Sequence, residues 1–177
     1  MFPKVTLVIG GASSGKSAFA ERLVLTAGKS PVYLATAQPL DGEMAERIAR
    51  HRKMRGDAWR TIEAPLAVAE VLQSLTSDEV VLFDCATLWL SNHLLKGHEI
   101  EAEQAALISA LDACVSSVVV VSNEVGQGVV PDNTLARRFS EAQGQLNQII
   151  ATHADLVVSV LAGLPMVLKG VLPGNAK

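Results

Sequence analysis

A short segment near the start of the chain has the residue types and the spacing needed to bind a phosphate chain. Residues 10–17 read GGASSGKS, which fits the pattern G-x-x-x-x-G-K-[ST]. In such a loop the glycines let backbone N–H groups surround the phosphates, the lysine contacts the β- and γ-phosphates, and the serine hydroxyl binds Mg²⁺. We therefore predict a nucleoside triphosphate site with Lys16 as a catalytic residue and Ser17 as a metal ligand. Its residues are Gly10, Gly11, Ala12, Ser13, Ser14, Gly15, Lys16 and Ser17.

Polar residues with a further chemical role are predicted after two later apolar runs. Asp84 ends the run VVLFD, and a carboxylate at a strand end beside a phosphate loop can hold Mg²⁺ directly or through water, so we expect a second metal ligand there. Glu124, in SNEVGQG, has two open interpretations: it binds metal or accepts a proton from an attacking hydroxyl, or it shapes a turn. Two interpretations are also open for Arg137 and Arg138: they contact phosphates, or they belong to an ordinary solvated helix face.

A histidine lies within a run of basic residues. His51 has cationic residues on both sides, all within five positions: Arg47, Arg50, Arg52, Lys53 and Arg55. These charges disfavour a further positive charge on the imidazole, so His51 should stay neutral near pH 7. The neutral imidazole is the nucleophilic form. The same side chains would neutralise a polyphosphate. Two interpretations stay open from the residues alone: His51 attacks an α-phosphate with pyrophosphate leaving, or it packs at the edge of the core beside solvated arginines.

The composition of the whole chain restricts the class of protein. We predict one domain over residues 1–177, because 49% apolar and 19% charged residues make a globular composition at a single-domain length. The net charge of −3 argues against nucleic acid as a partner, since that partner requires a basic excess. Cys85 and Cys114 lack metal-ligand spacing. We expect a cytoplasmic protein without a membrane span, because no apolar run reaches ~18 residues and the start does not read as a signal peptide.

Apolar runs alternate with helical patterns along the chain. The expected strands are residues 5–9, 32–35, 80–84, 118–122 and 156–161, and the expected helices are 16–27, 41–55, 66–75, 100–113 and 134–153. Near-continuous apolar strands separated by helices predict an α/β protein with a mostly parallel sheet flanked by helices. Gly163 and Pro165 predict the turn of a C-terminal β-hairpin. Because ligands bind at the carboxyl ends of parallel strands, the loops after the first four strands should meet in one site.

Five blocks of the sequence, taken together, resemble one enzyme family. They are GGASSGKS, YLATAQPLDGEMAERIARHRKMRGDAWRTIEAP, DCATLWLSN, SNEVGQGVVPDNTLARRFSEAQGQLNQ and ADLVVSVLAGLPMVLKG, and they cover nearly the whole chain. The blocks are similar to those of the bifunctional adenosylcobinamide kinase / adenosylcobinamide-phosphate guanylyltransferase family of cobalamin biosynthesis. The resemblance implies that ATP or GTP phosphorylates the terminal hydroxyl of adenosylcobinamide. It further implies that GMP from GTP is transferred to adenosylcobinamide phosphate, which gives adenosylcobinamide-GDP and pyrophosphate.

The same resemblance implies roles for individual residues. It implies a guanylyl-histidine on His51, a P-loop NTPase fold similar to RecA, and assembly as a homotrimer. The chain departs from many relatives at Ser13, where arginine is expected, and from some at Arg50, where histidine occurs. Beside the P-loop, the resemblance implies nucleotide contacts for Ala35, Thr36, Ala37, Arg52, Lys53, Met54, Arg55, Glu63 and Cys85.

Two alternatives remain at the level of the sequence. The first is a P-loop small-molecule enzyme with only one of the two activities. It is either a kinase in which His51 has a structural role, or a guanylyltransferase without kinase activity. The second is a RecA-like motor or nucleic-acid-binding module. The net charge, the 4% aromatic content and the lack of a basic arm count against this second alternative.

Overall fold

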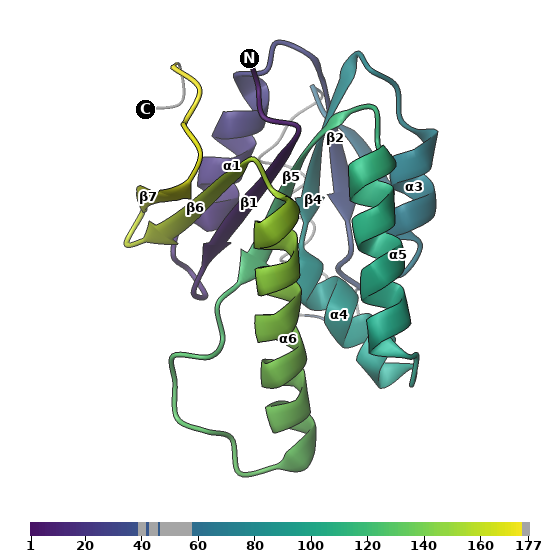
Figure 1. Ribbon diagram of the computed structural model, residues 1–177, viewed down its shortest axis with the longest axis vertical. Helices are drawn as coiled ribbons and strands as arrows, with labels where there is room; N and C mark the ends of the chain where they lie inside the picture. Colours follow the sequence, from purple (N-terminus) through teal and green to yellow (C-terminus); the bar gives the residue numbers. More distant parts are fainter. Residues whose placement is uncertain (39–41, 43–45, 47–57, 175–177) are drawn as a thin grey trace.

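The computed structural model describes residues 1–38, 42, 46 and 58–174, and within them seven strands form one sheet. The strand order is β3-β2-β4-β5-β1-β6-β7 (Figure 1). All neighbouring strands are parallel except β6 and β7, which form an antiparallel hairpin. The predicted α/β class, mostly parallel sheet and C-terminal hairpin are therefore confirmed. The strands are β1 Val5–Gly10, β2 Ser30–Ala35, β3 Arg60–Glu63, β4 Glu79–Asp84, β5 Ser117–Asn123, β6 Leu156–Leu161 and β7 Leu164–Lys169.

Helices cover both faces of the sheet (Figure 1). Helix α1 packs on one face, and α3, α4, α5 and α6 pack on the other. Four predicted helices are confirmed, whereas most of the fifth, at 41–55, lies outside the described residues. None of the described helices is long and apolar enough to cross a membrane. The helices are α1 Lys16–Leu25, α3 Val68–Ser74, α4 Ala86–Leu95, α5 Ile100–Ala113 and α6 Thr134–His153.

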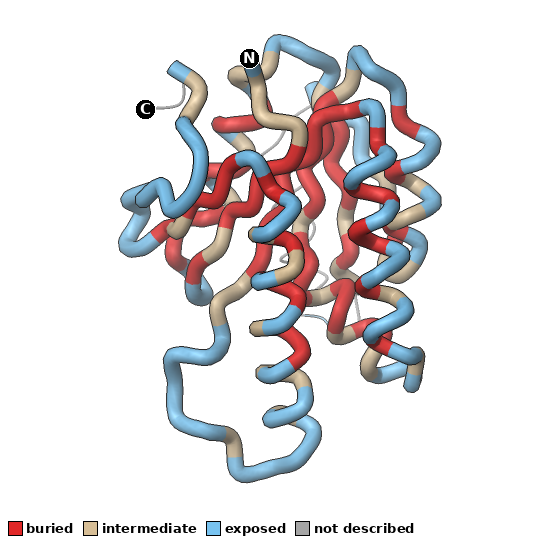
Figure 2. Tube along the Cα trace, in the orientation of Figure 1, coloured by how far each residue is buried: buried red, intermediate tan, exposed pale blue. Residues whose placement is uncertain are grey.

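The central strands are buried on both faces because each face has its own apolar core. Successive side chains of a strand point to opposite faces, so Val118 and Val120 of β5 enter the core under α3–α6. Val119 and Val121 enter the core under α1. Figure 2 shows this buried centre, and it also shows that the long connection from β5 to α6 is exposed. The near-continuous apolar runs in the sequence thus correspond to strands covered on both sides.

Two elements were missing from the sequence expectation, β3 and α4. Strand β3 has only four residues, RTIE, at the edge of the sheet, and its burial is slight. Helix α4 has buried residues distributed along its length, from Ala86 and Thr87 to Asn92 and His93. A helix that is buried in this way lacks the one-sided apolar pattern by which helices are recognised in a sequence.

A carboxylate joins the start of β1 to the start of β6. Oδ2 of Asp155 accepts hydrogen bonds from the backbone N–H groups of Lys4, at 2.9 Å, and Val5, at 3.1 Å. The backbone N–H of Asp155 donates to the carbonyl oxygen of Val5 at 2.9 Å. These three bonds set the register of β1 against β6, and this register positions the loop that follows β1.

We predict that Asp155→Ala lowers the free energy of unfolding by about 1–2 kcal/mol, because it removes two hydrogen bonds to the backbone of β1 that water replaces only in part. Asp155→Asn keeps an accepting oxygen and should lose less. Urea unfolding of the three proteins, followed by circular dichroism, measures both changes. An Asp155→Ala protein as stable as the parent would show that this carboxylate does not hold the strands together.

Candidate active site

The P-loop is a tight turn between the end of β1 and the start of α1. The N–H of Ser14 donates to the carbonyl oxygen of Gly11 at 3.3 Å, and the backbone takes positive φ angles of 57° at Ser13 and 91° at Gly15. Gly15 is the N-cap of α1 and supplies no side-chain capping bond. Since the first N–H groups of a helix have no acceptor within the helix, the turn directs backbone donors toward an anion.

Gly10 lies where no larger residue fits. A Cβ atom on Gly10 would lie 2.5 Å from the backbone oxygen of Val160 and 2.5 Å from Oγ of Ser14. Val160 belongs to β6, which pairs directly with β1, so its backbone cannot move without disturbing the sheet. From the hairpin turn, the N–H of Gly163 donates to the carbonyl oxygen of Ser14 at 2.8 Å. The C-terminal hairpin thus supports the P-loop.

The P-loop places the amine of Lys16 and the hydroxyls of Ser14 and Ser17 near the turn. Lys16 is buried, and its Nζ donates to the carbonyl oxygen of Gly11 at 3.1 Å, so the amine lies across the loop. Ser17 is half-buried in the first turn of α1. Oγ of Ser14 is buried and has no hydrogen-bond partner among the described residues. A buried hydroxyl of this kind is satisfied when a polar ligand binds the loop.

Asp84 lies at the same edge of the sheet as the P-loop. In the strand register Glu63, Ala35 and Asp84 stand side by side at the ends of β3, β2 and β4. Strand β5 separates β4 from β1, so the backbones of the last two lie about 10 Å apart. The hydroxyl of Tyr33 donates to Oδ2 of Asp84 at 3.0 Å and fixes the carboxylate. The predicted meeting of strand ends is therefore confirmed for Ala35 and Asp84, and Glu63, at the end of a strand that was not predicted from the sequence, lies beside them.

Thr36 connects the loops that follow β2 and β4. Its Oγ1 donates to the carbonyl oxygen of Cys85 at 2.8 Å and accepts from the N–H of Cys85 at 2.9 Å. Nδ2 of Asn92, on α4, donates to the carbonyl oxygens of Thr36, at 3.0 Å, and Pro65, at 2.9 Å. The side chain of Thr36 is thus used to position the site. Its predicted nucleotide contact, like that of half-buried Ala37, stays a prediction.

Cys85 is a structural thiol beside the site. Its Sγ accepts from the N–H of Leu88 at 3.4 Å and caps α4, and the Asp84–Cys85 peptide bond is cis. Burial, followed by the neighbouring Asp84 carboxylate, raises the pKa of the Cys85 thiol to about 11, whereas Lys16 acts in the opposite direction. The thiol thus caps α4 in its un-ionised form, and the predicted nucleotide contact of Cys85 stays a prediction.

A buried polar network supports the end of β5. Oγ of Ser122 donates to Oδ1 of Asn147 at 2.6 Å, and Nδ2 of Asn147 donates to the carbonyl oxygen of Asn123 at 3.0 Å. Nε2 of Gln143 donates to both Ser122 and Asn147. On the other side of the strand end, Oγ1 of Thr87 accepts from the N–H of Asn123 at 2.8 Å. These bonds fix the residue that precedes Glu124.

Glu124 lies directly beside the P-loop, because its N–H donates to the carbonyl oxygen of Gly10 at 3.1 Å. Its Oε1 accepts from the N–H of Gly126 at 2.7 Å, as the turn interpretation expects. The position beside the P-loop also fits the interpretation as metal ligand or proton acceptor. Arg137 donates to the carbonyl oxygens of Pro131 and Asp132, so it holds the loop before α6.

The predicted residues of the basic segment lie outside the described residues. They are His51, Arg52, Lys53, Met54 and Arg55. The chain is described again from Ala58, and the ring of Trp59 packs edge-on against Tyr33 with centroids 6.2 Å apart. Tyr33, Asn92, Gln143 and Asn147 are supporting residues that sequence reasoning missed. Each has a hydrogen-bond partner more than twenty residues away in the chain, and a single sequence carries no signal for such a pair.

A family model described as cobinamide kinase / cobinamide phosphate guanyltransferase matches residues 6–168 of the chain. The chain is 47% identical to the bifunctional adenosylcobalamin biosynthesis protein CobP of Pseudomonas aeruginosa over 167 residues, which are 93% of this chain and 96% of that protein. It is 38% identical to the bifunctional adenosylcobalamin biosynthesis protein CobU of Escherichia coli in an alignment of 179 positions that covers 92% of this chain and 98% of that protein.

Solved structures with low sequence identity share the fold. The RadB recombinase superposes with a TM-score of 0.53 at 16% identity, over 88% of this chain and 73% of that chain. An ATPase of a bacterial type III secretion system superposes with a TM-score of 0.51 at 11% identity, over 93% of this chain and 56% of that chain. Together with the P-loop geometry, these similarities confirm the predicted P-loop NTPase fold.

We predict that Gly10→Ala abolishes nucleotide binding and lowers the Tm by about 3–10 °C, because the new methyl group meets the backbone of β6. Gly11 is the matched control, since a Cβ there has nothing within 4 Å. Gly11→Ala should keep the Tm within about 1 °C. Differential scanning calorimetry, with titration of a fluorescent nucleotide, tests this. Equal Tm values for both variants would contradict the close approach at Gly10.

The raised pKa predicts that Cys85 is inert toward alkylation near neutral pH. At pH 8 a thiol with a pKa of about 11 is ionised in only about one molecule in a thousand, and the thiolate is the reactive form. Iodoacetamide should therefore modify Cys85 at least a hundredfold more slowly in the native protein than in urea, as measured by peptide mass spectrometry. Raising the pH to 10 should accelerate the native reaction. Rapid native labelling at pH 8 would refute the burial of this thiol.

Proposed function

The chain belongs to the cobinamide kinase / cobinamide phosphate guanyltransferase family, and we propose that residues 1–177 form one nucleotide-binding domain that performs both reactions at the carboxyl edge of its sheet. The observation that carries the proposal is the convergence of the P-loop, Asp84 and Glu63 at that edge, supported from behind by Thr36. One such site can bind the triphosphate for either reaction, first ATP or GTP for phosphorylation and then GTP for guanylyl transfer.

In the kinase step, the terminal hydroxyl oxygen of adenosylcobinamide attacks the γ-phosphorus of the triphosphate. The bond from the γ-phosphorus to the bridging oxygen breaks, and the nucleoside diphosphate leaves. Lys16 and the N–H groups of the P-loop stabilise the charge on the phosphates. We assign the hydroxyl proton to Glu124, whose backbone is bonded to Gly10 at the P-loop.

Mg²⁺ fits the donors of this site. The hydroxyl of Ser17 and the carboxylate of Asp84 are oxygen ligands of the kind that Mg²⁺ prefers, and Tyr33 orients the carboxylate. The buried hydroxyl of Ser14, which lacks a partner among the described residues, likewise fits a loop built around a polar ligand. When bound, Mg²⁺ would neutralise charge on the β- and γ-phosphates.

In the guanylyl step, the neutral imidazole of His51 attacks the α-phosphorus of GTP and pyrophosphate leaves. The phosphate of adenosylcobinamide phosphate then attacks the guanylyl-histidine, which gives adenosylcobinamide-GDP and restores His51. Arg52, Lys53 and Arg55 would neutralise the triphosphate during the first transfer. The support for this step is the sequence alone: one histidine within a basic segment that follows β2 at the carboxyl edge.

The assembly and location of the protein form part of the proposal. Exposed apolar side chains on the edge strand β7, among them Leu164, Met166 and Leu168, give a surface that another copy of the chain would cover. We therefore propose a homo-oligomer, a trimer by resemblance to the family, in the cytoplasm. Its small-molecule partners are adenosylcobinamide, adenosylcobinamide phosphate, ATP and GTP. The net charge of −3 argues against nucleic acid as a partner.

Incubation with GTP labelled at the α-phosphate tests the guanylyl step. We expect acid-labile label on the protein with release of pyrophosphate, and loss of the label in His51→Ala. The matched control His153→Ala should keep the label. His153 is the last residue of α6, where it pairs with Asp112, and it takes no part in the proposed reactions. Lys16→Ala should lose label and phosphorylation together. Label retained by His51→Ala, or arriving only from the γ-phosphate, would exclude a guanylyl-histidine.

A further inference from the structure

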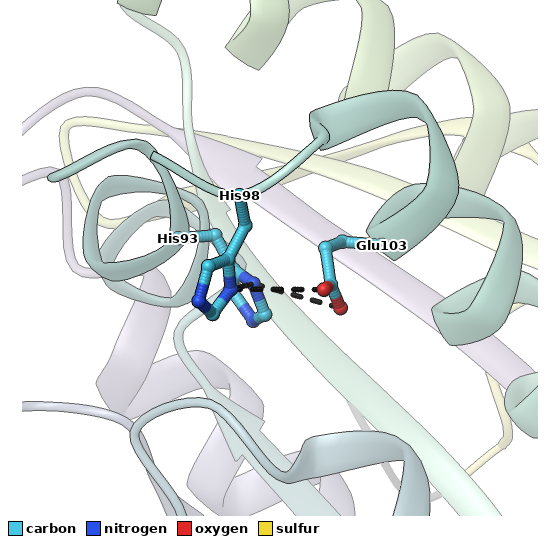
Figure 3. Close-up of side chains that lie close together, drawn as sticks. All are labelled: His93, His98 and Glu103. Carbon is cyan, nitrogen blue, oxygen red and sulfur yellow. Dashed lines mark hydrogen bonds and ion pairs between the residues drawn. The ribbon is translucent and has the colours of Figure 1, made fainter. Parts of the chain in front are cut away.

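Two histidines and a glutamate meet outside the nucleotide site, between α4 and α5 (Figure 3). His93 lies near the end of α4, His98 follows the Gly97 turn, and Glu103 lies in the first turn of α5. The two Nδ1 atoms are 2.9 Å apart. Oε2 of Glu103 lies 3.5 Å from Nδ1 of His93, and Oε1 lies 3.6 Å from Nδ1 of His98. Both imidazoles thus present the same ring atom to one carboxylate.

The surroundings of His93 determine which ring nitrogen carries its proton. Nε2 of His93 lies 3.4 Å from the carbonyl oxygen of Leu66. A carbonyl oxygen only accepts, so this contact is a hydrogen bond when the proton lies on Nε2. In the neutral ring, the lone pair on Nδ1 then points toward His98 and Glu103. Trp89 packs against the ring with centroids 4.6 Å apart and donates to the same carbonyl oxygen at 3.1 Å, which holds the imidazole in this orientation.

The distances in the cluster match those between ligands of one metal ion. The two Nδ1 atoms, 2.9 Å apart, can both lie about 2 Å from a common centre, the length of a Zn–N bond, and Oε2 of Glu103 lies 3.5 Å from Nδ1 of His93. A ring N–H donated to a backbone carbonyl is also the usual outer partner of a zinc-bound histidine, and Leu66 provides it. The three side chains therefore have the donor atoms, the spacing and the outer partner of a metal site.

We propose that His93, His98 and Glu103 bind a divalent transition-metal ion, with Zn²⁺ the best match, through both Nδ1 atoms and the carboxylate. Two imidazoles and one carboxylate favour zinc over Mg²⁺, which prefers oxygen ligands throughout. His98 is partly exposed, so its proton can reside on Nε2, toward solvent, while Nδ1 binds the ion. Water completes the tetrahedral coordination.

A metal at this position would act on the fold that supports the nucleotide site. The ion would join the end of α4 to the start of α5, and through His93 it would act on the carbonyl of Leu66. Asn92, next to His93, holds the carbonyl oxygens of Thr36 and Pro65. The metal would thus hold together α4, α5 and the segment around Leu66, which support the active site, and it would not contact the P-loop or Asp84.

Metal binding is tested by titration with Zn²⁺ in the absence of nucleotide, with Mg²⁺ in excess to occupy sites that prefer oxygen ligands. We expect one Zn²⁺ per chain by isothermal titration calorimetry. At a hundredfold excess of free Zn²⁺ over the Kd, the Tm should rise by about 5–10 °C, and EDTA should reverse the rise. Substitution with Co²⁺ should give the visible absorption of a tetrahedral site with nitrogen ligands.

His98→Ala and Glu103→Gln are the decisive variants, because both side chains are partly exposed and neither change opens a cavity in the core. Each should weaken Zn²⁺ binding at least tenfold and remove the Tm rise, while the metal-free Tm stays close to that of the parent. His153→Ala, which removes an imidazole paired with Asp112 elsewhere, should bind Zn²⁺ like the parent. Unchanged binding in both cluster variants, or no stoichiometric binding by the parent, would overturn the proposal.

Discussion

The candidate active site depends on the reciprocal hydrogen bonds between the hydroxyl of Thr36 and the backbone of Cys85. They bind the loop after β2 to the loop after β4, in an interior where an unpaired donor or acceptor would cost about 1–3 kcal/mol. Asn92 extends the connection to Pro65, just beyond β3. Side-chain to backbone hydrogen bonds therefore join the ends of three strands to α4, at the edge of the sheet where the P-loop also lies.

The hairpin supplies the second half of this alignment. Val160 limits the space at Gly10, and Gly163 is bonded to Ser14, so the P-loop lies against a part of the chain that makes no chemical contribution of its own. These two contacts restrict the geometry of a loop that must bind several negative charges. Catalysis by positioning requires a pre-formed site of this kind, since order achieved only on binding would consume binding energy.

Sequence reasoning predicted the parts of the molecule whose signals are local. The P-loop pattern, the buried strands such as β5 and the turn at Gly163 each depend on residues close together in the chain, and all three are present. Strand β3 and helix α4 were missed, because the first is short and the second is buried without a one-sided pattern. Thr36 with Cys85, and Asn147 with Asn123, could not be predicted because tertiary folding alone brings these partners together.

The strand order has a consequence for how the protein is made. Strand β1 pairs with β5 and β6, so the N-terminal P-loop is flanked only by strands that are synthesised late. In a chain emerging from the ribosome, the phosphate-binding sequence precedes both strands that flank it, and the hairpin that supports it emerges later still. Because contacts between such distant segments form slowly, the nucleotide site is among the last parts to be completed, and nucleotide cannot assist the early steps of folding.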